Sequence, residues 1–251
     1  MYIEQIVLEV TRSCNLNCIH CCRGCSQKIH FNPCYLDNIF NGIDSIGCIT
    51  FTGGEPLLKI GTIIKVLDYI REHKISLGGF YIVHNGTIFS KYLLNILNDY
   101  YENYVDAKEM CGFSLSTDRF HLNQIRQAKL RNRYYDYIEL RDCFGFEFIY
   151  DDRKEIFSLI ESGRGKQNKS IINTKYGSRK ASFYNGFVMN EYGSYSDTLI
   201  YISANGNVIS DCDLSYDVID MLSFGNIKKT DLIDIIKSHT IEEDNLKKIE
   251  I

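Results

Sequence analysis

Strand-like and helix-like segments alternate along the chain up to residue 162, and this alternation limits the fold more than any other feature. Short runs rich in β-branched and aromatic residues, typical of strands, occur over residues 3–10, 47–51, 80–83, 113–116 and 144–150. Helical spacing of apolar residues occurs between and after them, over residues 35–46, 57–73, 90–104, 122–135 and 152–162. Repeated β–α units predict an α/β fold with a parallel sheet, in which ligands gather at the carboxyl ends of the strands.

The pattern becomes polar and weakly periodic after about residue 163. Farther along, Asn205-Gly206 separates two β-rich runs, 199–202 and 207–209, and Asn-Gly in this position is a strong hairpin signal. A helix is predicted over residues 231–238. We therefore expect a core over residues 1–165, a connecting segment over residues 166–197 and a small hairpin-plus-helix appendage over residues 198–251.

The composition is that of a globular protein without a strong charge bias. Hydrophobic residues make up 45% of the 251 residues and the formal net charge is -4, so no electrostatic footprint for nucleic acid is expected. Residues 1–10 lack the basic start and the apolar stretch of a signal peptide, and no segment reaches the ~20 apolar residues of a membrane span. These features predict a cytoplasmic protein with neither a membrane nor a nucleic acid as partner.

Ten cysteines need an explanation, and five of them crowd between Cys14 and Cys25. Many disulfide pairings at such short spacings would be strained, so metal ligands are the better interpretation in a reducing compartment. Cys14, Cys18 and Cys21 form a C-x3-C-x2-C pattern directly after the first predicted strand. Three thiolates can hold a cubane iron–sulfur cluster and leave one iron open to a non-protein ligand. The scattered cysteines are most simply small buried hydrophobic residues: Cys48, Cys111 and Cys143.

A second motif, Gly53-Gly54-Glu55-Pro56, follows the second predicted strand. In this order and in this β–α context, the two motifs resemble the radical S-adenosylmethionine (radical SAM) superfamily over about residues 3–165. The resemblance implies a partial (β/α)6 TIM-like barrel. It also implies that three irons of a 4Fe–4S cluster are bound by Cys14, Cys18 and Cys21.

In that family the fourth iron binds the amine and the carboxylate of SAM. One electron, from an external reductant of the flavodoxin or ferredoxin type, cleaves SAM reductively at the cluster. The resulting 5′-deoxyadenosyl radical abstracts a hydrogen from the substrate. The cofactors carry the difficult chemistry, so the protein is expected to position and to shield them.

The resemblance assigns further residues to SAM. Gly53 and Gly54 lack a Cβ, so the backbone can approach a ligand closely, and Glu55 would help to fix the methionine ammonium. The alternative is a plain strand-to-helix turn, with Pro56 at the start of the helix. His20 lies between two of the cysteines, where the family usually has a ring near the adenine, and its alternative is a solvent-facing loop histidine.

Positions farther along complete the expected SAM site. Asn85-Gly86 resembles the turn after the third strand of the family, although it also fits a plain turn. Ser116 and Asp118 share one face at the end of the fourth predicted strand, where the family binds the ribose and carboxylate of SAM. His121 belongs to the same motif, and its alternative is a helix-start residue. Arg164 lies in a Gly-Arg-Gly-Lys segment that resembles Gly-Arg-Ala-Lys in peptide-modifying members; it would pair with a carboxylate, or else the segment is a helix C-cap with a basic flank.

The predicted appendage resembles half of a C-terminal extension called SPASM or twitch, through residues 205–212 and 225–227. That extension binds auxiliary 4Fe–4S clusters through several cysteines, whereas Cys212 is the one cysteine after Cys143 in this sequence. Three roles for Cys212 stay open: a structural residue after loss of the cluster, a catalytic hydrogen donor to a substrate radical as in radical SAM peptide epimerases, or a ligand of an auxiliary cluster. In the last case distant cysteines would complete the set: Cys22, Cys25 and Cys34.

The function predicted from these motifs is that of a radical SAM enzyme. A peptide is the favoured substrate, in a reaction of the maturase or epimerase type. The alternatives are a small metabolite, a nucleotide, or activation of a glycyl-radical enzyme. A protein that is not an enzyme, either an iron–sulfur electron carrier or a zinc-stabilised protein, would also use clustered cysteines.

Overall fold

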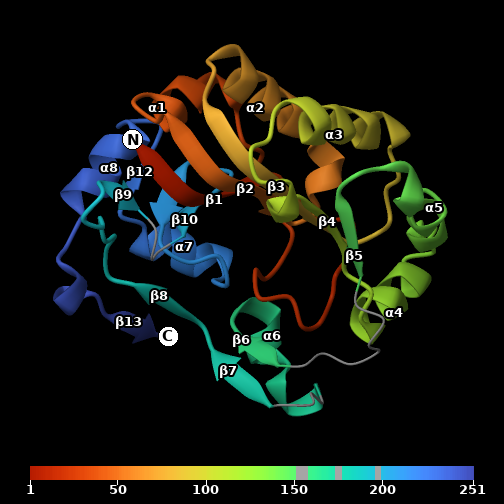
Figure 1. Cartoon of the computed structure of the whole chain (residues 1–251). Helices are drawn as coiled ribbons and strands as arrows, with labels where there is room; N and C mark the ends of the chain where they lie inside the picture. The colour runs from red at the N-terminus through yellow and green to blue at the C-terminus, as the bar shows by residue number, and fades with distance from the viewer. Residues whose placement is uncertain (151–157, 173–176, 196–198) are drawn as a thin grey trace.

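A computed structural model describes residues 1–150, 158–172, 177–195 and 199–251 of the chain, and its centre is one sheet (Figure 1). Within the described residues, parallel neighbours follow one another in chain order from β1 to β5. Their bounds are Tyr2–Thr11 for β1, Ser45–Gly53 for β2, Ser76–His84 for β3, Gly112–Leu115 for β4 and Glu147–Tyr150 for β5. The predicted α/β fold with a parallel sheet is confirmed.

Three helices cover one face of this sheet (Figure 1): α1 (Leu36–Phe40), α2 (Ile60–Glu72) and α3 (Lys91–Asn103). Helix α2 carries its apolar side chains at the i, i+3, i+4, i+7 spacing that makes one buried stripe, namely Ile63, Val66, Leu67 and Ile70. These side chains belong to the same core as Phe51 of β2 and Phe80 of β3, which are fully buried. Burial of one such side chain contributes ~2 kcal/mol, so the helix-covered face holds the strands in place.

Two of the predicted helices are shorter than expected. The helix predicted over residues 35–46 ends at Phe40, because Gly42 takes a φ of 76° and the chain turns toward β2. The helix predicted over residues 122–135 is in fact two helices, α4 (Arg119–Gln127) and α5 (Tyr134–Ile138). Lys129 lies between them with a φ of 53°, in the left-handed region. The helical spacing of apolar residues continues across both breaks, so this pattern does not reveal where the helices end.

Other boundaries also differ. The helix predicted over residues 57–73 begins with a 3-10 turn, η2 (Pro56–Lys59). Of the helix predicted over residues 152–162, residues 152–157 lie outside the described residues, and Leu159–Glu161 is strand β6 rather than helix. The remaining 3-10 turns are η1 (Pro33–Tyr35), η3 (Lys108–Met110), η4 (Arg141–Cys143), η5 (Lys169–Ile171) and η6 (Glu243–Asn245).

The C-terminal part of the chain adds to the same sheet instead of standing beside it. The predicted hairpin is confirmed as β10 (Ile200–Ile202) and β11 (Asn207–Ile209), and β10 pairs in parallel with β1. The strand path therefore runs β12-β11-β10-β1-β2-β3-β4-β5, with β12 at Gly225–Asn226 and β9 (Ser194–Tyr195) also pairing with β1. Closure of this path into a barrel is not seen among the described strands. The division of the chain into core, connecting segment and appendage stays a prediction.

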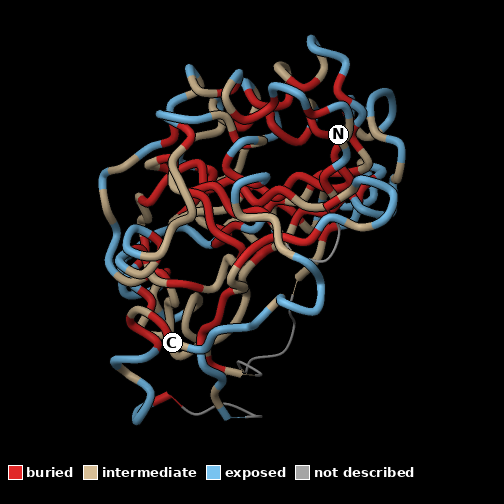
Figure 2. Tube along the Cα trace, turned by 90° about the vertical axis from the view of Figure 1, so that its left-hand side faces the viewer, coloured by how far each residue is buried: buried red, intermediate tan, exposed pale blue. Residues whose placement is uncertain are grey.

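Smaller elements complete the fold. Strand β6 pairs with β7 (Ser178–Lys180), and β8 (Ser182–Tyr184) pairs with β13 (Lys248–Glu250). The last helices are α6 (Gly163–Gln167), α7 (Tyr216–Leu222) and α8 (Leu232–Ser238). Figure 2 shows the buried trace concentrated in the middle of the molecule, with exposed segments around its rim. Among the described helices, none has the length and the apolar character needed to cross a membrane.

Candidate functional site

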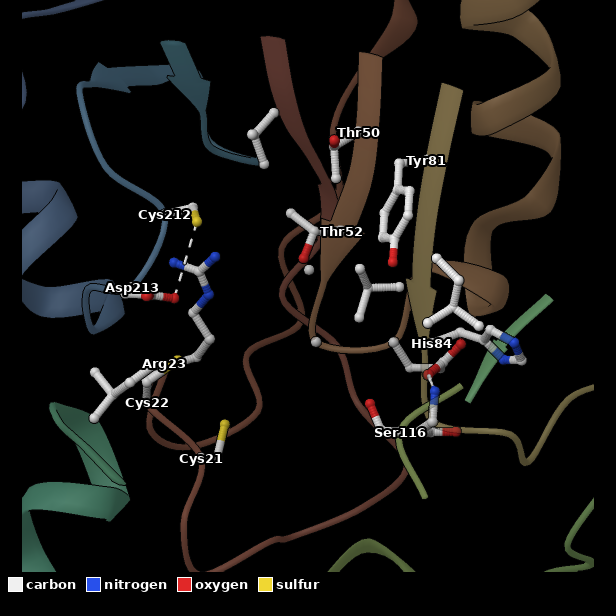
Figure 3. Close-up of a pocket in the computed structure, with 18 of the residues that line it drawn as sticks. Cys21, Cys22, Arg23, Thr50, Thr52, Tyr81, His84, Ser116, Cys212 and Asp213 are labelled. Atoms are coloured by element: carbon white, nitrogen blue, oxygen red, sulfur yellow. Dashed lines mark hydrogen bonds between the residues drawn. The ribbon is translucent and has the colours of Figure 1, made fainter. Parts of the chain in front are cut away.

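The segment between β1 and η1, residues 12–32, is called the cysteine loop here. It carries the cysteine motif to the carboxyl end of the sheet. A cavity of about 1080 Å³ lies there, and Cys14, Cys18 and Cys21 line it. Every other residue predicted for the site also lines it: His20, Gly53, Gly54, Glu55, Asn85, Ser116, Asp118, Arg164 and Cys212. Figure 3 shows Ser116 and Cys212 on opposite sides of this space, with Cys21 on the loop between them. The fold thus gathers residues that are far apart in the sequence.

Nitrogen donors are directed at the sulfur of Cys14. The N–H of Leu16 donates to Cys14 Sγ over 3.4 Å, and Asn85 Nδ2 lies 3.9 Å from the same sulfur. Burial raises the pKa of Cys14 to about 12, whereas a bound metal ion would deprotonate the thiol. All ten cysteines lie in described parts of the chain and are free thiols. Three free thiols with N–H donors near a sulfur are a donor set that fits an iron–sulfur cluster.

Gly53 and Gly54 are required by protein backbone that passes beside them. Gly53 has a φ of 147°, and a Cβ on it would lie 2.2 Å from Thr11 O. A Cβ on Gly54 would lie 2.4 Å from Ser13 O. The N–H of Gly54 donates to Thr11 O over 2.7 Å, and that of Glu55 to Ser13 O over 2.8 Å. The two glycines therefore hold the end of β2 against the first residues of the cysteine loop.

Glu55 is fully buried and joins the ends of β2 and β3. Its Oε1 accepts from the N–H of Leu57 over 3.0 Å, and its Oε2 accepts from the N–H of Asn85 over 2.8 Å. Burial raises the pKa of this carboxyl to about 7. Asn85 Nδ2 in turn donates to Asn15 Oδ1 over 2.9 Å and so holds the cysteine loop. Glu55 thus links the ends of β2 and β3, and its role toward SAM stays a prediction. Pro56 starts a 3-10 turn, as the turn interpretation expected.

Asp118 caps helix α4 and gathers two histidines. Its Oδ1 accepts from the N–H groups of Phe120 and His121 over 2.9 and 3.1 Å, and its Oδ2 contacts the His121 ring. His20 Nε2 lies 3.8 Å from Asp118 Oδ2, and the His20 ring packs against those of Phe120 and His121. His20 is therefore a packed ring in the wall of the cavity.

Burial and neighbouring charges have opposite effects on the pKa values of Asp118 and His121. Burial by itself would raise the pKa of Asp118, but the His121 ring holds it well below its usual range. Burial by itself would lower the pKa of His121, but Asp118 and the Cys18 thiol raise it to about 10. His121 is thus both a helix-start residue and a neighbour of Cys18. Ser116 reaches the cavity from the end of β4, where its N–H donates to His84 O over 2.9 Å.

Helix α6 packs directly on the cysteine loop. Arg164, which is 9% exposed, donates through Nε to Cys18 O over 2.9 Å and through Nη1 to Asn17 Oδ1. Gly163 and Gly165 allow this contact, since a Cβ on them would lie 2.4 and 3.0 Å from carbonyl oxygens of the loop. The C-cap interpretation of this segment is wrong, because Gly163 begins α6 instead of following a helix. Two N–H donors of Arg164 are thus hydrogen-bonded to the cysteine loop.

Cys212 lies across the cavity from Ser116, near Cys22 and Arg23 of the cysteine loop (Figure 3). Cys212 Sγ is 3.9 Å from Asp213 Oδ1. Burial raises the pKa of Cys212 and of Cys22 to about 12. Two cysteines considered for an auxiliary cluster are exposed and are not among the described residues that line this cavity: Cys25 and Cys34.

Sequence reasoning missed Arg12, whose side chain is fully buried beside the motif. Arg12 donates to both oxygens of Asp220 over 2.8 and 2.6 Å and to Glu9 Oε2 over 3.1 Å, and it lies 4.6 Å over the Tyr216 ring. These contacts tie the cysteine loop to helix α7. The available signal was the pair Glu9 and Arg12, two charged residues at the end of an apolar strand.

The inner face of the sheet was also missed. Thr50 and Thr52 of β2 and Tyr81 of β3 line the cavity, while Ile49 and Phe51 are fully buried in the core. Alternation of polar and apolar residues along a strand separates two faces, so this pattern could have been used to predict a polar interior.

No protein-family model matches the chain. Over 78 residues the chain is 37% identical to the uncharacterized protein MJ0907 of Methanocaldococcus jannaschii. That match covers 28% of this chain and 26% of the length of its relative.

Solved structures resemble the chain over nearly its whole length. Native anSMEcpe with bound AdoMet and Cp18Cys peptide superposes with a TM-score of 0.57 at 13% identity, over 97% of this chain and 85% of that one. A histidine-tagged form of anSMEcpe with bound AdoMet gives a TM-score of 0.51 at 14% identity, over 94% and 77%. Native anSMEcpe with bound AdoMet and Kp18Cys peptide gives 0.50 at 14% identity, over 94% and 80%. The chain has the radical SAM fold, with its C-x3-C-x2-C motif on the loop after β1.

Proposed function

We propose that this protein is a radical SAM enzyme that acts on a peptide. The observation that carries the proposal is the single cavity lined by the three cysteines of the motif, by the glycines at the end of β2 and by Ser116 and Cys212 across from one another. A carrier of electrons or a zinc-stabilised protein does not need such a cavity beside its cysteines. An enzyme needs one to hold a cofactor and a substrate together.

The cluster would be held by Cys14, Cys18 and Cys21. When bound, the cluster and SAM would supply a one-electron reductive cleavage that yields a 5′-deoxyadenosyl radical able to abstract a substrate hydrogen. The chain itself holds the cysteine loop by hydrogen bonds from outside it. Arg164 and Asn168 bind the carbonyl oxygens of Cys18 and Ile19 over 2.9 and 3.1 Å. Such contacts position the thiols before any cofactor arrives.

SAM would lie along the ends of β2, β3 and β4, on the side of the cavity that carries Gly53, Gly54 and Ser116. Glu55 serves this site indirectly, since its two oxygens bind backbone N–H groups. Asp118 would hold His20 and His121 around the site. The charge of Asp118 is paired with the His121 ring, so the two side chains act as one fixed part of the wall of the site.

A peptide is the favoured substrate for two reasons. The cavity of about 1080 Å³ is at the upper end of the size range of small-molecule sites, which favours a second molecule beside a cofactor. Two structures of this fold, both of anSMEcpe, are described with a bound peptide as well as AdoMet. An external one-electron reductant of the flavodoxin or ferredoxin type would supply the electron.

Cys212 is the candidate hydrogen donor to the substrate radical. Its burial keeps the thiol protonated at neutral pH, because the pKa is raised to about 12. The S–H bond that a donor needs is therefore present. Its position across the cavity from Ser116 would let a substrate lie between the two sides.

The test is anaerobic purification followed by iron and sulfide analysis and by an assay for 5′-deoxyadenosine. We expect about four irons per chain and SAM cleavage after reduction. Cys18→Ala should abolish cleavage, while Cys143→Ala, at an exposed cysteine that does not line the cavity, should keep most of it. Equal losses in the two variants would point to misfolding, and a colourless protein that binds zinc and leaves SAM intact would refute the proposal.

A further inference from the structure

Arg23 is a buried cation in the wall of the cavity, on the side that carries Cys212 (Figure 3). The residue is only 7% exposed. Its Nη1 donates to Leu214 O over 3.1 Å, and its Cζ lies 4.7 Å from the centre of the Tyr201 ring. A guanidinium has five N–H donors, and in the described part of the chain Leu214 O is the one acceptor within hydrogen-bond distance of this one. Arg23 is thus held in place with most of its donors unused.

The acidic groups near Arg23 make their hydrogen bonds and ion pairs with other residues, and the second oxygen of Glu9, Oε1, is buried without a hydrogen-bond partner among the described residues. Glu9 Oε2 accepts from Arg12 Nε over 3.1 Å and from the N–H of Ala204 over 2.8 Å. Asp213, in the same wall, pairs with Arg179. Within the described residues, no carboxylate lies within 4.0 Å of the Arg23 guanidinium. A buried charge that lacks a direct partner is costly, so an anion that enters the cavity would gain from meeting it.

The charges in the cavity limit what that anion can be. Among the described lining residues, Arg23 and Arg164 are the two arginines and there is no lysine. Arg164 already binds the cysteine loop, and the His121 ring is paired with Asp118. Acidic residues are more numerous in the same lining: Glu4, Glu55, Glu109, Asp118, Glu147 and Asp213. A phosphate carries about two negative charges and would be repelled by this surrounding. A carboxylate carries one charge and fits the planar fork of one arginine.

We propose that Arg23 binds a carboxylate group of the substrate on the Cys212 side of the cavity. This proposal rests on the proposed function and narrows its substrate to a peptide with an acidic side chain or a free C-terminal carboxylate at the reacting segment. Ser116, which is expected to bind SAM, lies on the opposite side of the cavity, so we assign the carboxylate of SAM to that side and not to Arg23. Anchoring at Arg23 would hold the substrate beside Cys212.

Chemical modification of the wild-type holoenzyme tests this directly. Phenylglyoxal condenses with guanidinium groups, and peptide mass spectrometry measures the rate at each arginine. With SAM bound, we expect Arg23 to react and millimolar Ac-Gly-Glu-Gly-NH2 or Ac-Gly-Gly-Gly-OH to slow that reaction several-fold. The uncharged analogue, Ac-Gly-Gln-Gly-NH2, should leave the rate of Arg23 modification unchanged. Arg164 is the matched control, because it is equally buried in the same cavity but hydrogen-bonded to the loop.

The modification rates decide whether Arg23 binds a carboxylate. Equal protection by the acidic and uncharged probes, protection by neither, or an Arg23 as inert as Arg164 would overturn the proposal. In a second arm, Arg23→Gln should change the dissociation constant of SAM by less than about twofold, and a loss of about tenfold or more would assign Arg23 to SAM itself. Failure of the proposed function would appear separately, as a protein that does not cleave SAM while Arg23 is still protected by carboxylates.

Discussion

Single side chains hold a cysteine loop that has no regular structure of its own. Its buried carbonyl oxygens need donors, because unpaired polar groups inside a protein are costly. Arg164 of helix α6 and Asn168, the residue after it, donate to backbone carbonyl oxygens of the loop. Asn85, at the end of β3, donates to the side-chain oxygen of Asn15. Since these contacts involve only protein atoms, they fix the loop whether or not a cofactor is bound.

His84 makes the stability of this site sensitive to acid. It is buried at the end of β3, where its Nδ1 accepts from the N–H of Gly86 over 3.2 Å, and burial lowers its pKa to about 3. An unfolded histidine titrates near pH 6.5, so between about pH 6.5 and 3 the unfolded chain binds the extra proton and stability falls as the pH falls, by up to ~1.4 kcal/mol per pH unit. Denaturant titrations of wild type and His84→Phe should show a shallower acid slope in the variant. Identical slopes would contradict this account.

At the scale of elements, the short helix α6 packs against the cysteine loop and stabilises its position. Gly165 donates its N–H to Cys21 O over 3.2 Å, and a Cβ there would lie 2.6 Å from Ile160 O. Close contact of helix and loop thus depends on glycine. Helix α2 offers the opposite case, because a Cβ on Gly61 would meet nothing within 4 Å.

Two glycine-to-alanine changes should therefore have opposite signs. Gly165→Ala is expected to lower the free energy of unfolding by ~1–3 kcal/mol, since it forces a methyl group against backbone. Gly61→Ala should raise it by ~0.5–1 kcal/mol, because alanine reduces the freedom of the unfolded chain. Thermal and denaturant unfolding of the two variants measure both effects. A stabilising Gly165→Ala would mean that α6 has room to move away from the loop.

At the scale of the whole molecule, the C-terminal residues are built into the core. Strand β10 pairs with β1, and Tyr216 of α7 donates its N–H to Arg23 O over 3.1 Å. Asp220 of the same helix binds Arg12 through both oxygens. The cysteine loop, which follows β1, is thus held in part by a helix from the C-terminal part of the chain.

Asp220→Ala should loosen this connection. The buried Arg12 would lose its bidentate partner, for an expected cost of ~1–3 kcal/mol, and amide hydrogen exchange should rise in α7 and in the first residues of the cysteine loop. Asp217→Ala, on an exposed position of the same helix, is the control and should change stability by about 0.5 kcal/mol or less. Unchanged exchange in the loop of Asp220→Ala would show that the loop does not depend on α7.

Local patterns predicted much of this architecture. The five parallel strands, the long helices α2 and α3 between them and the Asn205-Gly206 hairpin follow from periodicity and turn chemistry, which act over a few residues. The helix breaks at Gly42 and Lys129 did not follow, because each depends on where the next element must pack. The fold of radical SAM proteins was predicted from two motifs and is confirmed.

The sequence by itself determined the two motifs of the candidate site, since three cysteines at fixed spacing and two glycines after a strand are local features. Only the tertiary structure decided which residues surround them. Pairing of β10 with β1 brings Cys212 to the cavity, Arg164 donates hydrogen bonds to the cysteine loop, and Arg23 is buried with most of its N–H donors not hydrogen-bonded to described residues. These roles depend on contacts between residues far apart in the chain, and such contacts are set by packing of the whole sheet, which no local pattern contains.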